Sequence, residues 1–229
     1  MGGTGMVLAA AVAFLGTHFL LSHPLRAPIV GRIGERPFLG LYSLVAAATL
    51  GWLVVAYRAV GPEQPWWNVD DALWVLATIV MLVASVLLIG SLIGNPAMPG
   101  AVSAAPAEAK GVFAITRHPM LWSFVLWGVA HILVFPTLAN MILAKAIILL
   151  SLVGAALQDR KKERLQPERW RAWEAKTSYW PFAAIAAGRA RFGGFRPHDW
   201  AGGIILWLGA TWAHGPLAGM PAGIWRWIS

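Results

Sequence analysis

Long apolar runs separated by short polar segments dominate the chain. A helix needs about 20 apolar residues to cross a bilayer, and runs near that length recur here. They are unbroken rather than alternating, which favours helices over the strands of a closed barrel. The sequence therefore predicts an all-α, polytopic transmembrane helical bundle. The six expected spans cover residues 6–22, 38–57, 72–94, 117–136, 138–157 and 199–214.

Three other segments interrupt this pattern. Residues 95–110 are rich in Pro, Gly and Ala and are expected to form a loop. Residues 158–180 carry tryptophans among charges, so we expect a cytoplasmic amphipathic helix with Trp rings among lipid headgroups. A solvated connector fits this segment equally well, and a lid over a site is a third interpretation. Residues 181–195 are apolar but short, which is typical of an interfacial or re-entrant segment. No internal repeat stands out, so residues 1–229 are expected to form a single domain.

Composition and charge agree with a membrane protein. The chain is 58% hydrophobic and 12% charged, whereas soluble domains carry about 25% charged residues. The net charge is +8, but fifteen of the eighteen Lys and Arg residues fall in the loops after the first, third and fifth runs. This distribution indicates the positive-inside rule rather than nucleic-acid binding. It predicts an inner-membrane protein with its basic loops in the cytoplasm and both termini outside. The first run lacks a basic start and is expected to be a retained span.

Few residues in the spans could carry chemistry. The chain has no cysteine, which excludes disulfides, thiolate ligands and covalent haem attachment through Cys. Walker, dinucleotide-binding, metalloprotease and serine-hydrolase motifs are absent. Carboxylates are scarce in the spans, which argues against a di-iron site and against paired-carboxylate catalysis.

Histidine is the remaining candidate. Ionisable residues inside a membrane are costly and are functional candidates by default, and imidazole is the commonest metal ligand. His18 and His131 fall inside two different spans, with His131 about 20 Å along its helix. A hydrogen bond between helices would satisfy His131 equally well. His118 precedes His131 by 13 residues, about 220° around a helix, so the two cannot share one metal. We expect His118 and Arg117 at the cytoplasmic mouth, facing an anionic group.

Two histidines on separate helices suit haem b with bis-histidine axial ligation. His18 and His131 would bind the iron, while cations would meet the propionates. The available cations are Arg26, Arg32, Arg117, His118 and Lys145. One difficulty is that His18 lies only about 10 Å from the cytoplasmic end of its span, against about 20 Å for His131. The pair therefore requires a first helix that continues past Pro24, tilted helices or an oblique haem.

Four stretches together carry a resemblance to a known family: "GTHFLLSHPLR", "RPFLGLYSLVA", "ITRHPMLWSFVLWGVAH" and "TSYWPFAAIAAGR". They resemble the NnrU family and its plant and cyanobacterial relative, 15-cis-zeta-carotene isomerase. The resemblance implies an integral membrane protein. For the isomerase it implies haem b and a redox-dependent isomerisation of a polyene double bond. The isomerase's histidine ligands match His18 and His131, but the cysteine three residues before the second ligand is Gly128 here. A lipophilic substrate and an electron donor are the expected partners beside the lipid bilayer.

Two alternatives stay open. NnrU proteins are associated with denitrification, so the first alternative is a non-enzymatic haem or redox protein that supports that process. The other is a membrane methyltransferase that uses S-adenosylmethionine. Isoprenylcysteine carboxyl methyltransferases carry a similar Arg-His-Pro element, and the matching kinds of residues here are Arg117, His118, Glu163 and Trp173.

Overall fold

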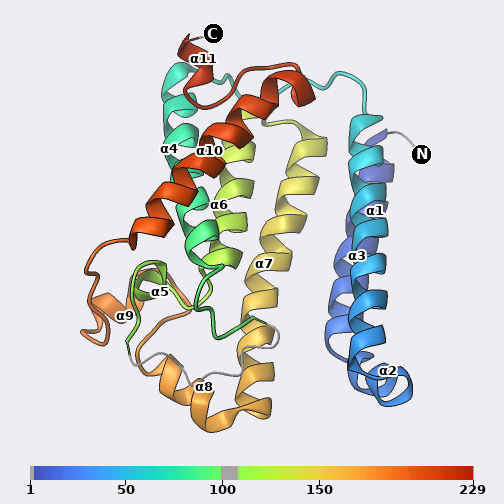
Figure 1. The fold of residues 1–229 in the computed structure, drawn as a ribbon. Coiled ribbons are helices and arrows are strands. Elements are labelled where there is room, and N and C mark those ends of the chain that lie inside the picture. Colours follow the sequence, from blue (N-terminus) through green and yellow to red (C-terminus); the bar gives the residue numbers. More distant parts are fainter. Residues whose placement is uncertain (1–2, 99–107, 229) are drawn as a thin grey trace. The chain divides into compact units, whose positions relative to one another are not determined.

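The computed structural model describes residues 3–98 and 108–228 of the chain. Every regular element in these ranges is a helix, as the apolar runs predict (Figure 1). The elements are α1 Gly3–Ser22, α2 Arg26–Ile33, α3 Glu35–Arg58, α4 Asp71–Gly90, α5 Val112–Ile115, α6 Pro119–Val134, α7 Leu138–Leu165, α8 Pro167–Glu174, α9 Ala183–Ala186, α10 Pro197–Ala218 and α11 Trp225–Ile228.

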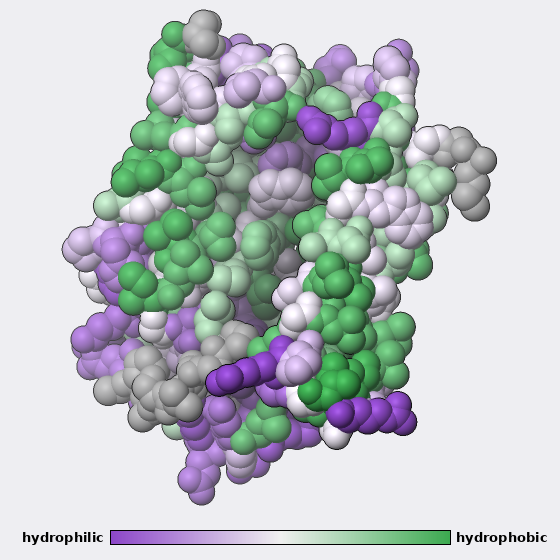
Figure 2. All heavy atoms as spheres, turned by 45° about the vertical axis from the view of Figure 1, so that its right-hand side comes forward, coloured by the Kyte–Doolittle hydropathy of each residue, from purple (hydrophilic) through white to green (hydrophobic). Residues whose placement is uncertain are grey.

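Four of these helices, α1, α3, α4 and α7, are long and apolar enough to cross a membrane. They fall on the first, second, third and fifth expected spans. Helix α6 is apolar but only 16 residues long, and α10 is not among the four although it has 22 residues. The expectation of membrane-spanning helices is confirmed, whereas the count of six is not. On the face drawn in Figure 2, hydrophobic residues cover the helices and hydrophilic ones gather toward their ends.

The chain divides into two compact units. The first unit comprises Met1–Val69 and His131–Leu150, and the second comprises Asp70–Ala130 and Ser151–Ser229. Both α6 and α7 contribute residues to each unit. The prediction of a single domain stays a prediction.

Helices α1 and α3 run side by side in the first unit and are joined through α2 (Figure 1). The sequence placed only a short basic segment where α2 lies. Gly34 separates α2 from α3 with a φ of +86°, a backbone conformation that favours glycine. An ion pair between Arg26 and Glu35 spans the same turn. Eight buried apolar residues of this unit form one cluster: Val7, Ala10, Ala11, Phe14, Leu53, Ala56, Ala139 and Ala146.

Helices α4 and α10 pack closely in the second unit. A Cβ atom on Gly203 would lie only 2.7 Å from the Cα atom of Val86, so the two backbones approach at a residue without a side chain. Small residues allow this kind of approach between apolar helices. At the start of α10, the buried carboxylate of Asp199 accepts a hydrogen bond from the backbone N–H of Arg196 at 2.9 Å. This contact closes the first turn of the helix.

The polar segment 158–180 differs from the amphipathic helix that the sequence suggested. Helix α7 continues to Leu165, and α8 then brings Trp170 and Trp173 into the protein, where each is only 1% exposed. Trp173 contacts the ring of Phe113 edge to face, with ring centroids 5.9 Å apart. These two rings belong to the core of the second unit, so a headgroup location for them is not confirmed.

Candidate functional site

The Arg-His-Pro element lies in the second unit, directly before α6. Pro119 is the first residue of α6, a position that its fixed φ and missing N–H suit. The preceding Thr116 is extended, and its hydroxyl donates to the backbone oxygen of Tyr179 at 2.8 Å. The backbone N–H of Arg117 donates to the oxygen of Ser178 at 2.8 Å. These hydrogen bonds to the segment after α8 thus fix the backbone of Thr116 and Arg117, and with it the direction of the Arg117 and His118 side chains.

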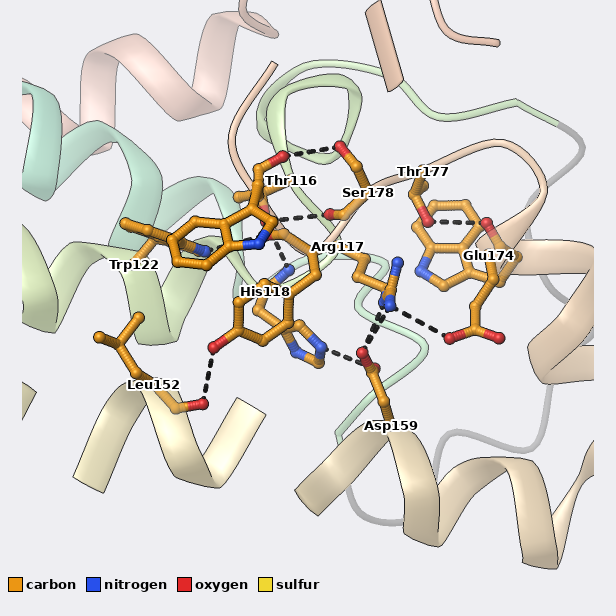
Figure 3. Close-up of polar contacts among 12 residues, drawn as sticks. Thr116, Arg117, His118, Trp122, Leu152, Asp159, Glu174, Thr177 and Ser178 are labelled. Atoms are coloured by element: carbon orange, nitrogen blue, oxygen red, sulfur yellow. Dashed lines mark hydrogen bonds and ion pairs between the residues drawn. The ribbon is translucent and has the colours of Figure 1, made fainter. Parts of the chain in front are cut away.

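Asp159 of α7 joins the side chains of Arg117 and His118 (Figure 3). One carboxylate oxygen accepts from Nε and Nη2 of Arg117 at 2.9 and 2.6 Å. The other oxygen lies 2.7 Å from Nε2 of His118. Arg117 also pairs with Glu174 of α8 at 3.1 Å. The three members His118, Asp159 and Arg117 are 1%, 9% and 13% exposed, so the network is almost entirely desolvated.

Aromatic rings surround His118. The ring centroids of Tyr179 and Trp170 lie 5.9 and 6.4 Å from that of His118. The Tyr179 hydroxyl donates to the backbone oxygen of Leu152 at 2.7 Å, and Trp122 donates to the backbone oxygen of Tyr179 at 2.9 Å. Burial raises the pKa of Tyr179, and the nearby Asp159 raises it further. The phenol therefore stays protonated and keeps donating its hydrogen bond.

This network connects the start of α6 to the end of α7 and to α8. It contains its own anions, because the carboxylates of Asp159 and Glu174 face Arg117 and His118. The anionic group that Arg117 and His118 meet in the structure is therefore Asp159. Their assignment to a cofactor stays a prediction. Asp159 was not among the residues expected from the sequence. The available signal was a carboxylate directly after the apolar run 138–157, because such a charge requires a partner.

His18 lies four residues before the end of α1, in the first unit. Its Nδ1 atom is 2.7 Å from the backbone oxygen of Phe14, and a carbonyl can only accept, so Nδ1 carries the proton. This tautomer leaves the lone pair of Nε2 available, which is the arrangement found in metal-bound histidines. The Phe14 and Tyr42 rings pack against the imidazole, with centroids 4.3 and 5.7 Å from its own. The surroundings of His18 fit those of an axial ligand.

His131 lies in the last turn of α6, and the structure associates it with a different part of the first unit. Its backbone oxygen accepts from the side chain of Asn140 at 2.9 Å, near the start of α7. Two residues later, the backbone oxygen of Leu133 accepts from the Trp67 indole at 3.0 Å. His131 therefore lies beside the loop that follows α3.

Helix α3 shows how far apart the two histidines are. His18 contacts Tyr42 near the start of α3, whereas Arg58 at its end lines a cavity together with Val134 of α6. At 1.5 Å per residue, Tyr42 and Arg58 are about 24 Å apart along the axis, which leaves roughly 20 Å between the levels of His18 and His131. Two nitrogens on one iron lie within about 4 Å of each other, at metal–nitrogen bonds of about 2 Å.

Shared ligation by His18 and His131 was expected to require a first helix that continues past Pro24, tilted helices or an oblique haem. Helix α1 ends at Ser22 and does not continue past Pro24. The structure thus does not bring His18 and His131 to one position, and their shared ligation of an iron stays a prediction. Among residues 3–98 and 108–228, no group of three or more His, Asp or Glu side chains could hold a metal ion. A haem needs only one or two protein ligands, so this observation does not bear on it.

Comparison with known proteins gives two matches. The family model described as "NnrU protein" matches residues 6–222, which is most of the chain. A chloroplastic protein of Zea mays named 15-cis-zeta-carotene isomerase is 31% identical over 113 residues. This match covers 45% of the present chain and 30% of the maize protein, so the chain corresponds to less than a third of that relative's length. No solved structure matches the chain.

Proposed function

The chain belongs to the NnrU family, and from this membership we propose that it is a membrane enzyme that isomerises a cis double bond in a lipophilic polyene. The observation that carries this proposal is the similarity to 15-cis-zeta-carotene isomerase of Zea mays. The apolar character of α1, α3, α4 and α7 supports it, since a polyene dissolves in the hydrocarbon that such helices contact. A substrate of this kind needs no charged group for its recognition.

Haem b is the cofactor that we propose, and His18 would be one of the residues that hold its iron. The hydrogen bond from Nδ1 of His18 to the Phe14 oxygen supports this role, because it orients Nε2 for an iron. Bound iron would supply a Lewis-acid and one-electron centre. We propose His131 as the second ligand, which requires a rearrangement within the first unit. No step of the reaction is assigned to the iron.

The proposal also includes the cellular setting. An electron donor would control the redox state of the haem. We place the protein in the inner membrane with its basic loops in the cytoplasm and both termini outside, because the Lys and Arg residues are so unequally distributed.

Isomerase activity can be tested in light-excluded cells that make 15-cis-zeta-carotene. Expression of this chain should lower the share of the 15-cis isomer measured by HPLC, and His18→Ala should abolish that change. His214→Ala is the matched control, because Nδ1 of His214 makes the same bond to a backbone oxygen four residues earlier. An unchanged isomer ratio with the wild-type chain contradicts the polyene substrate.

Absorption spectra of the purified protein test the cofactor separately. A Soret band with sharp reduced α and β bands, lost or shifted in both His18→Ala and His131→Ala, would establish bis-histidine haem b. A spectrum changed only by His18→Ala would assign one ligand and leave His131 to helix packing. Haem without isomerisation would favour the redox protein that supports denitrification. A haem-free protein that releases heat on binding S-adenosylmethionine would favour the methyltransferase.

A further inference from the structure

A basic pocket lies in the second unit, and the residues that line it include neither Arg117 nor His118. It is formed by the chain before α5, by Lys176 just after α8 and by the segment after α9, next to elements labelled in Figure 1. Its volume is about 730 Å³. Five cations and one carboxylate line it: Lys110, Lys176, Arg189, Arg191, Arg196 and Glu108.

Two of the five positive charges are matched by carboxylates. Arg196 pairs with the buried Asp199 at 3.0 Å. Lys110 pairs with Glu108 at 3.2 Å, although both side chains are more than 70% exposed. Within the described ranges, Lys176 and Arg191 make no ion pair. The pocket is therefore positive even after its internal pairs are counted.

Arg189 adds a third uncompensated charge at a fixed position. Its Nη1 atom donates to three backbone oxygens at the end of α8, those of Glu174, Ala175 and Thr177, at 2.9, 3.2 and 2.9 Å. These acceptors are neutral, so they hold the guanidinium without cancelling its charge. A cation at a helix C-terminus is favourable by itself, and here it also forms part of the pocket wall.

The backbone of the pocket leaves further donors available. Residues 190–196 form no regular element, and Gly194 has a φ of +98°. Of the described residues, Arg191 to Phe195 make no hydrogen bond through their backbone N–H groups. A glycine-containing run of unpaired amides beside Lys and Arg side chains is a common environment for phosphate oxygens.

Exposed aromatic rings lie next to the basic residues. Phe192 and Trp200 are 42% and 43% exposed, and both pack edge to face on Phe195, which lines the pocket, with centroids 5.1 Å apart in each pair. Trp and other aromatic side chains concentrate at the level of lipid headgroups. Rings and cations together match a headgroup that carries a negative phosphate.

We propose that this pocket binds a phosphate-bearing anion, with the phosphate between Arg191 and Lys176. An anionic lipid headgroup and a free phosphate compound share this chemistry. The neighbouring aromatic rings favour the lipid. The site is independent of the isomerase proposal, because none of its residues is among the proposed haem ligands.

Native mass spectrometry of the detergent-purified protein tests the proposal. The probes are phosphatidylglycerol, phosphatidylcholine with its neutral headgroup, and inorganic pyrophosphate. The wild-type chain should bind phosphatidylglycerol in preference to phosphatidylcholine, and added salt should weaken this binding. Replacing both cations, Lys176→Glu with Arg191→Glu, should lower the affinity at least about tenfold.

The control is Arg171→Glu, which reverses one charge, as each of the two pocket substitutions does, at an exposed α8 residue that does not line the pocket. Circular dichroism should show equal helix content in all variants. Should the double reversal not fold, Lys176→Gln with Arg191→Gln removes the charges more gently. Pyrophosphate binding that the pocket variants weaken, without lipid preference, would identify a soluble phosphate as the ligand. Binding that Arg171→Glu weakens as much as the pocket variants do, or no binding of either anion, would overturn the proposal.

Discussion

Among the described residues, the buried side chains of the first unit are uncharged and mostly apolar, with Thr137 and Asn140 as polar members, whereas those of the second unit include ionisable groups. Leu53 and Phe14 are typical of the first interior. His118 and Asp159 are buried in the second, joined by a hydrogen bond of 2.7 Å. Apolar helices gain little from burial when the alternative is lipid, so packing alone holds them together. Desolvated charges instead depend strongly on each partner, since removing one leaves another uncompensated. The two units should therefore respond very differently to substitution.

The largest effect is expected from Asp159→Ala. It leaves Arg117 and His118 buried without their carboxylate, and breaking a buried pair costs about 3–5 kcal/mol. The midpoint of thermal unfolding in detergent should fall steeply, with a loss of expressed protein. Asp159→Asn keeps the shape and one acceptor oxygen and should cost less. A shift for Asp159→Ala no larger than that of an apolar substitution in the first unit would contradict the comparison.

A smaller loss is expected where α4 and α10 touch. Gly203→Ala places a Cβ atom against the Val86 backbone, which cannot move aside as a flexible side chain could. Overpacking of this kind costs about 1–3 kcal/mol. The control is Gly209→Ala in the same helix, where a Cβ atom would meet nothing within 4 Å. That substitution should raise stability by up to about 1 kcal/mol, because Ala favours helix more than Gly does. Equal unfolding midpoints for the two variants would show that the close approach is absent.

The first unit should tolerate the loss of apolar atoms better. Leu→Ala in a water-surrounded core costs about 2–5 kcal/mol, of which about 2.4 is the transfer of three carbon groups from water. In a membrane-spanning helix the alternative environment is lipid rather than water, so this transfer free energy largely disappears. Leu53→Ala should therefore cost about 1–2 kcal/mol of unfolding free energy. Val55→Ala, at a residue that is 67% exposed in the same helix, should change the unfolding midpoint very little. A cost for Leu53→Ala above that of Asp159→Ala would reverse the comparison.

The sequence predicted the helices of the first unit better than the contacts of the second. Apolar runs are local signals, and α1 and α3 lie where those runs are. Helix α2 was missed because its eight residues are too few and too polar for an apolar period to stand out. The candidate residues His18, Arg117 and His118 were singled out from their types, and their roles stay predictions. Their partners were not singled out, because Asp159 is 41 residues from His118 and only the fold brings them together.

The tryptophans of α8 show a second limit. Charges surround Trp170 and Trp173, so the local pattern indicated a membrane surface. The structure instead packs Trp173 on Phe113, a residue 60 positions earlier. Local polarity describes where a helix could lie in isolation, whereas burial depends on which distant surface is available to cover it.

The smallest expected effect is a pH dependence at Glu174, on the edge of the charged network. Burial raises the pKa of Glu174 above its ordinary value of 4.5; Arg117 opposes this shift, while Asp159 and Glu163 add to it. The folded protein therefore holds a proton that the unfolded chain releases. By linkage, the stability that this proton provides is complete below pH 4.5 and is lost as the pH rises through the raised pKa.

Glu174→Gln tests this sign, because glutamine does not titrate. Its unfolding midpoint relative to wild type should rise as the pH increases from 4.5, and should level off once the wild-type carboxyl is ionised. Arg117 keeps its pair with Asp159 in the variant, and its attraction for the ionised Glu174 is already part of the net shift of that carboxyl's pKa. Thermal unfolding of both proteins across one pH series separates this pH-dependent difference from any constant effect of the substitution. A difference that falls with pH would mean that Arg117 outweighs burial at Glu174, and that the edge of the network is governed by its ion pair.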